Sequence, residues 1–283
     1  MGFALLAACL PALADSVDGS TADWGTISTN PHDSRRLTYD FAAGVSAFVE
    51  DTGGENRVGP GYGGQDYDVE ALFSRLERTV FSGGLLTGFD LTLGEPRSHH
   101  SGQRYLPGDY LLDFGCDGGY DLALDFSSYS GGRIDLVRLA GDNRDLAPVV
   151  IGSHRFVGPW AWNPAHGGTV VGSVSAYLGQ ATNLGGDHQF FEFSFDLSTT
   201  PGLAGLDLHC ISANWTMQCG NDFGQVQAQL PTPVPEPSPL LLLLLGAALL
   251  GAAALRRRRA MSRALWADRS PAGRSGGSAS PTC

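Results

Sequence analysis

The chain has 283 residues, and its formal net charge is −11 at pH 7. All 18 of its basic side chains are arginines; seven of them, with one aspartate, follow residue 239, so the preceding part carries −17 (−11 minus 6). This acidity excludes a nucleic-acid-binding protein, because such binding depends on neutralising phosphates with cations.

The first predicted element is a signal peptide over residues 1–14. The segment is apolar and ends Ala12-Leu13-Ala14, a small-x-small pattern typical of a signal-peptidase cleavage site. Its positive n-region is missing, so we expect the translation start to lie upstream. An alternative is that Leu6-Ala7-Ala8-Cys9 is a lipobox whose cysteine is lipidated.

Residues 15–230 predict an all-β ectodomain, an antiparallel β-sandwich of jelly-roll-like type. Paired glycines punctuate this segment, and short runs of β-forming residues lie between them. The clearest run is 191–197, where alternation places three phenylalanines and Leu197 on one face. The other expected strands are 37–41, 110–114, 122–126, 134–139, 149–157, 170–178, 206–211 and 225–230.

Residues 68–81 allow two interpretations. Their apolar side chains, from Val69 to Val80, fall at helical spacing, and the residue propensities permit a helix. The residues alone therefore leave a helix and a pair of strands open.

Acidic residues around a glycine turn form a candidate calcium loop. Asp113, Asp117, Gly118 and Asp121 occupy positions 1, 5, 6 and 9 of the calcium-loop template. Position 12, however, is Leu124, where the template has a bidentate glutamate. We expect a hairpin turn stabilised by these side chains, with bound calcium as the alternative.

Trp160 and Trp162 are the candidate carbohydrate-binding residues. Their alternate spacing places both rings on one side of an extended segment, from which exposed rings could stack on sugars. The alternative is that they pack in the core beneath a loop.

The remaining polar residues predict no catalytic site. Glu192 and Asp196 share one face of a strand but lie about 13 Å apart, too far for glycoside hydrolysis, so we expect solvated charges. His99, His100 and His209 lack the spacing of a metal site. No serine-hydrolase, zinc-protease or phosphate-loop motif is present, so we expect no enzyme.

Three cysteines belong to the expected mature protein. In an oxidising compartment Cys210 and Cys219 form the expected disulfide, because the loop between them is short. Two alternatives stay open: Cys116 pairs instead, or no cysteine pairs.

The C-terminal part predicts a membrane anchor. Alternating prolines make residues 231–239 an extended linker. Residues 240–255 are apolar and predict a single transmembrane helix of roughly 24 Å. The block Arg256-Arg257-Arg258-Arg259 indicates that residues 256–283 form a cytoplasmic tail and that the body lies outside.

Val234-Pro235-Glu236-Pro237, the apolar segment and the arginine block resemble the PEP-CTERM sorting signal of bacterial exported proteins. The resemblance implies processing by a membrane-embedded exosortase near Pro-Glu-Pro and transfer of the body to the envelope. One departure is that residues 260–283 continue past the arginine block, where the family usually ends.

Patterns in the body are similar to PEP-CTERM surface proteins. They include Tyr67-Asp68-Val69-Glu70-Ala71-Leu72-Phe73 and Trp215-Thr216-Met217-Gln218-Cys219-Gly220-Asn221-Asp222. This resemblance implies paired strands over residues 68–81. It also implies a surface β domain. The family often has a histidine where this chain has Asn214, so any role of that histidine is not carried over to this chain.

Together these features predict a non-enzymatic surface or extracellular-matrix protein. Its expected partners are an exosortase-type enzyme, the inner membrane during export, and the envelope or its exopolysaccharide. The alternatives are a carbohydrate-binding module and a secreted hydrolase without a recognisable motif.

Overall fold

The computed structural model describes residues 17–30, 33–49, 64–97, 102–149, 158–184, 188–229 and residue 250. The chain divides into two compact units, Met1–Leu230 and Pro231–Cys283. In the second unit one residue is described, the exposed and helical Leu250. The signal peptide (1–14), the linker (231–239), the other residues of the expected span (240–255) and the tail (256–283) lie outside the described residues.

Among the residues that the structure describes, no helix is both long enough and apolar enough to cross a membrane.

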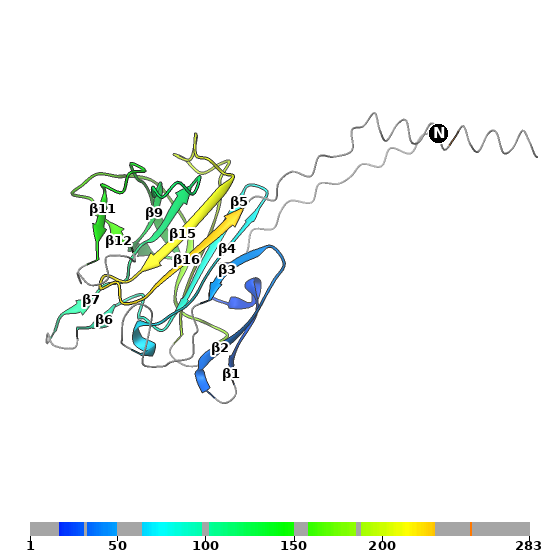
Figure 1. The fold of residues 1–283 in the computed structure, drawn as a ribbon, viewed down its shortest axis with the longest axis vertical. Helices are drawn as coiled ribbons and strands as arrows, with labels where there is room; N and C mark the ends of the chain where they lie inside the picture. Colours follow the sequence, from blue (N-terminus) through cyan, green and yellow to red (C-terminus); the bar gives the residue numbers. More distant parts are fainter. Residues whose placement is uncertain are drawn as a thin grey trace, which may run out of the picture. The chain divides into compact units, whose positions relative to one another are not determined.

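Ten strands of the first unit form one antiparallel sheet (Figure 1). Their order is β16-β15-β8-β9-β10-β13-β14-β5-β4-β3. Their bounds are β3 Val45–Val49, β4 Val69–Glu77, β5 Val80–Thr87, β8 Tyr110–Phe114, β9 Leu122–Ser130, β10 Arg133–Arg138, β13 Thr169–Gln180, β14 Gln189–Asp196, β15 Cys210–Thr216 and β16 Phe223–Gln229.

Smaller elements accompany this sheet. Antiparallel pairs form between β1 and β2, β6 and β7, and β11 and β12. The bounds of these strands and of two 3-10 turns are η1 Thr21–Trp24, β1 Gly25–Asn30, β2 Asp33–Phe41, η2 Gln65–Tyr67, β6 Glu95–Pro96, β7 Arg104–Tyr105, β11 Leu146–Pro148 and β12 Pro159–Trp162.

The large sheet curls until its two ends meet. β16 packs on β4, where a Cβ at Gly224 would lie 3.0 Å from the Leu72 Cβ. The Asp222 carboxylate accepts a hydrogen bond of 2.7 Å from the Val69 amide, and the Phe48 and Phe223 rings stack. The all-β antiparallel class is therefore confirmed, but one nearly closed sheet encloses the core instead of two separate sheets (Figure 1).

The inner face of the curled sheet holds the main core. Phe191, Phe193 and Phe195 of β14 lie in one buried cluster, which confirms the face predicted from their alternation. Glycine makes room for these rings on β5, since a Cβ at Gly83 would lie 2.5 Å from the Phe193 ring.

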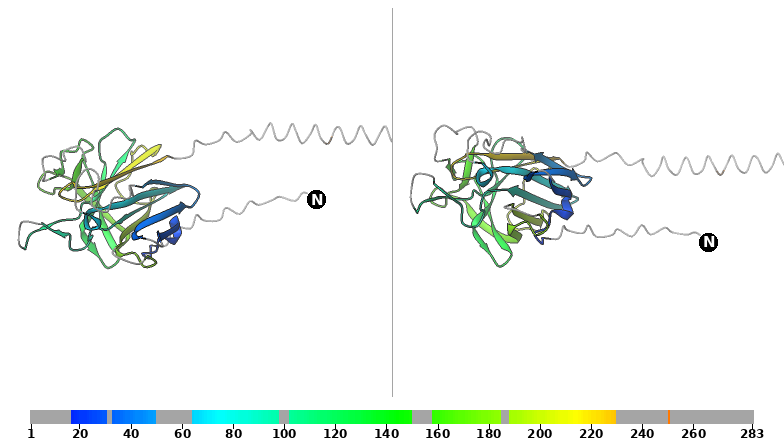
Figure 2. Two further views of the ribbon diagram at one scale, coloured as in Figure 1. Left: turned by 60° about the horizontal axis from the view of Figure 1, so that its bottom comes forward. Right: turned by 90° about the horizontal axis from the view of Figure 1, so that it is seen from below.

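The outer face of β4, β5 and β14 is covered by the N-terminal segment. Trp24 of η1 and Ile27 of β1 belong to a second buried cluster with Phe73 and Phe190 of the sheet. The Trp24 and Phe73 rings lie 4.7 Å apart. The first half of β14 is therefore buried on both of its faces, whereas Ser194 and Asp196 near its end are half-buried. The N-terminal hairpin is drawn in blue in Figure 2.

Several expected strands are found, with shifted ends. Residues 68–81 form the hairpin of β4 and β5, so the paired-strand interpretation is confirmed and the helix is excluded. A two-residue loop joins the strands, and its first residue, Arg78, has φ 55°. The strand expected at 206–211 begins instead at Cys210, because the Leu206 amide closes a turn by donating to the Leu203 carbonyl. Most of the strand expected at 149–157 lies outside the described residues.

We expect the Gly108→Ala substitution to destabilise the body by about 2 kcal/mol or more, because it forces a methyl group into closely packed backbone. The new Cβ would lie 1.9 Å from the Thr216 carbonyl oxygen and 2.5 Å from that of Trp160. Denaturant titration measures the change. Gly102→Ala is the control. Its new Cβ would meet nothing within 4 Å, but the residue has φ 79°, so this variant measures the cost of backbone strain without crowding. Equal stabilities of the Gly108 variant and the wild type would contradict the expected crowding.

Candidate functional site

The disulfide differs from the expected one. Cys116 pairs with Cys210, with a Cα–Cα distance of 5.7 Å, and Cys219 is a buried free thiol. Strand pairing is the reason: β8 and β15 are neighbours, and the Gly115 amide donates a 2.8 Å hydrogen bond to the Cys210 carbonyl. Cys219 lies instead in the main core beyond the other end of β15, where burial raises the pKa of its thiol to about 11.

The candidate calcium loop forms a turn held by its own carboxylates. The Asp113 carboxylate accepts hydrogen bonds from the Asp117 and Gly118 amides, and the Asp117 carboxylate accepts one from Gly119. Asp121 accepts one from the Phe114 amide. Within the described ranges no group of three or more His, Cys, Asp or Glu side chains could hold a metal ion. These hydrogen bonds form the turn that the sequence predicts, and bound calcium stays an untested alternative.

The two tryptophans lie on β12 and are both half-buried, with Ala161 buried between them. Trp162 packs against a small apolar cluster, and its Nε1 donates a 2.8 Å hydrogen bond to the Gly167 carbonyl. The Asp109 carboxylate holds the strand in place by accepting a 2.7 Å hydrogen bond from the Trp162 amide. Trp162 therefore has a packing role.

Glu192 is not the solvated charge that its strand pattern predicted. Its side chain is 1% exposed, because the N-terminal segment covers this face of β14. Its carboxylate accepts hydrogen bonds of 2.6 Å from the Asp18 and Gly19 amides and of 3.4 Å from Trp24 Nε1. Burial outweighs these bonds and raises the pKa of Glu192 to about 7. Asp196, two pleats away, is half-buried and accepts hydrogen bonds from Ser198.

Other buried polar side chains also serve the fold. Glu70 lies at a bulge of β4, and its Oε1 is 3.4 Å from Nδ1 of the buried His188. Asn214, Trp215 and Thr216 are buried in β15. His209 is exposed and pairs with Asp207, while His99 and His100 lie outside the described residues.

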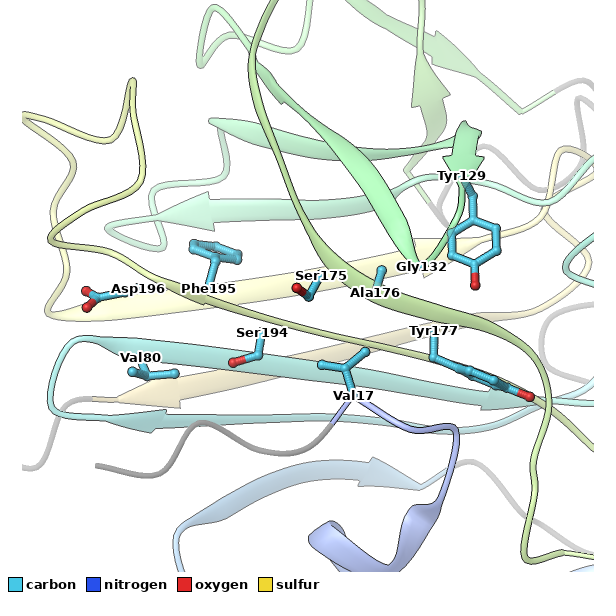
Figure 3. A pocket seen from close by; sticks show the side chains of 10 residues that line it. All are labelled: Val17, Val80, Tyr129, Gly132, Ser175, Ala176, Tyr177, Ser194, Phe195 and Asp196. Atoms are coloured by element: carbon cyan, nitrogen blue, oxygen red, sulfur yellow. The ribbon is translucent and has the colours of Figure 1, made fainter. Parts of the chain in front are cut away.

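A cleft of about 690 Å³ lies on the outer face of β13 and β14 (Figure 3). Ser175 and Ser194 lie on its floor, with Tyr129 at one end and Asp196 at the other (Figure 3). Val17 of the N-terminal segment also lines it. Among these residues only Asp196 was considered for a catalytic role from the sequence, because serines and tyrosines on separate strands form no motif.

The sorting signal lies outside the described residues, apart from Leu250, and is defined by its sequence. Residues 233–259 match the family model of the PEP-CTERM protein-sorting motif. The chain therefore contains a PEP-CTERM protein-sorting motif. The match covers Val234-Pro235-Glu236-Pro237 and extends to Arg259, and so includes every residue predicted for the signal. No curated protein and no solved structure matches the chain.

Proposed function

We propose that this PEP-CTERM protein is a non-enzymatic component of the cell surface or extracellular matrix. The observation that carries the proposal is the sorting motif at residues 233–259, which implies export and processing by an exosortase-type enzyme. In this proposal the segment 240–255 anchors the precursor in the inner membrane, and Arg256–Arg259 hold its C-terminal end in the cytoplasm.

Two features of the body support the proposal that it is a structural component. Its strands end at Gln229, before the motif begins, so cleavage near Pro-Glu-Pro removes no described strand. The carboxylates of Glu192 and Asp109 accept hydrogen bonds from backbone amides, which gives them roles in the fold. The proposed partners of the released body are the envelope and its exopolysaccharide.

Intact mass in the native host tests the sorting step. We expect the mature protein to end near Pro235–Pro237 and to occur in the outer envelope or the medium. Replacing Glu236 and Pro237 by alanine is expected to leave an uncleaved form in the inner membrane, because the enzyme then lacks its recognition sequence.

Pro231→Ala is the matched control, since it changes a linker proline that precedes the matched residues. This variant should be processed like the wild type. A wild-type protein of full-length mass in the inner membrane would contradict the sorting proposal and would make the apolar segment a permanent anchor.

A further inference from the structure

The cleft of Figure 3 has a floor of small polar side chains. Ser194 of β14 pairs in register with Ser175 of β13 on one side and with Ser82 of β5 on the other. The Ser82 Oγ donates a 3.1 Å hydrogen bond to the Ser194 Oγ. Ser175 is exposed and Ser194 half-buried, so hydroxyl groups of two adjacent strands face the open cleft.

The borders of the cleft are built by three separate parts of the chain. Glu192 fixes Asp18 and Gly19, which places Val17 along one border. Gly19 lies against the Tyr177 ring, where a Cβ would come within 2.4 Å. The other borders come from the hairpin of β9 and β10, with Tyr129, and from the end of β14 (Figure 3).

Tyr129 is the accessible ring of the cleft. Tyr129 and Tyr177 are both half-buried, but one face of Tyr177 is occupied by Gly19. The Tyr177 hydroxyl also donates a hydrogen bond to the Gln180 carbonyl, which leaves Tyr129 as the ring that a ligand can use. An aromatic face provides apolar contact, and hydroxyl groups both donate and accept hydrogen bonds. A ligand that fits this combination has C–H faces and many hydroxyl groups.

We propose that this cleft binds a short segment of a neutral polysaccharide, with a sugar ring stacked on Tyr129 and sugar hydroxyls bonded to Ser175 and Ser194. The cleft volume lies within the usual range of ligand sites. The charge of −17 before residue 240 disfavours polyanions such as polyuronates. The cleft is a different site from Trp160 and Trp162. The proposal adds a ligand class to the proposed surface function, and it holds whether or not the chain is sorted.

The test measures binding of the purified full-length chain, in detergent, to neutral hexasaccharides of glucose, mannose and N-acetylglucosamine and to polygalacturonate. We expect at least one neutral probe to bind. Tyr129→Ala should weaken its binding about tenfold, as truncation of a central aromatic contact does. Tyr129→Phe, which keeps the ring, should stay within a few fold of the wild type.

Trp160→Ala is the matched control and should bind like the wild type. Ser175→Leu gives a second, independent variant at an exposed position, and its larger side chain should block the floor and weaken binding about tenfold. Far-UV circular dichroism and thermal unfolding verify that each variant is folded.

Three results would overturn the proposal. They are the absence of binding to every neutral probe, binding restricted to polygalacturonate, and loss of binding in Trp160→Ala while Tyr129→Ala and Ser175→Leu bind normally. Because binding is measured on the unprocessed chain, none of these results depends on whether an exosortase cleaves the protein.

Discussion

Removing the Cys116–Cys210 disulfide, by the double substitution to serine, is expected to lower the free energy of unfolding by about 4–5 kcal/mol. The bond joins residues 94 positions apart, and a cross-link over so long a loop restricts the unfolded chain strongly. Urea titration of the oxidised wild type and of the double variant measures the difference. Thiol mapping by mass spectrometry should find Cys116 and Cys210 in one linked peptide pair.

Cys219→Ala is the matched control. The Cys219 thiol is buried and forms no disulfide, so the variant loses packing but no cross-link. Its free energy of unfolding should therefore decrease by about 1–2 kcal/mol. A linked Cys210–Cys219 peptide, or a larger loss in Cys219→Ala than in the double variant, would show that the pairing is different.

The stability of the body is expected to decrease as the pH rises from 5 to 8. The pKa of Glu192 is raised from its ordinary value of 4.5 to about 7, chiefly by burial. The folded state therefore retains a proton that the unfolded state has lost, and this contribution is complete below pH 4.5 and lost as pH rises through 7. The shift corresponds to about 3 kcal/mol.

Glu192→Gln isolates this contribution, because the amide mimics the protonated carboxyl beneath Asp18 and Gly19. Its stability should vary less between pH 5 and 8 than that of the wild type. Burial, and secondly the nearby Asp125, raise the pKa of Asp109 to about 7. Asp109 therefore also lowers stability as the pH rises, and because it is unchanged in Glu192→Gln, this part of the pH dependence should remain in the variant. Identical pH profiles of wild type and Glu192→Gln would refute the assignment to Glu192.

Features encoded in contiguous residues could be predicted from the sequence. The sorting motif is one uninterrupted segment, and its three parts are recognisable by residue type alone. The inner face of β14 was equally clear, because every second side chain from Phe191 to Leu197 is apolar. The all-β class followed from many such short runs.

Features that depend on distant pairing could not be predicted. Alternation predicted a solvated Glu192, because it describes the two faces of a strand but does not show that Trp24, 168 residues away, covers the second face. Cys210 has a near neighbour in sequence, yet the pairing of β8 with β15 brings Cys116 closer to it. The cleft likewise combines residues from β9, β13, β14 and the N-terminal segment.

The meeting of β4 and β16 has a consequence for the timing of folding. Val69 and Asp222 are 153 positions apart, so the sheet cannot close until nearly the whole body is available to fold. Contacts of such long range make folding slow, and the phenylalanine-rich face of β14 is exposed in the meantime. The body is therefore open to aggregation until its last strand arrives, and closure of the sheet is the step that ends this exposure.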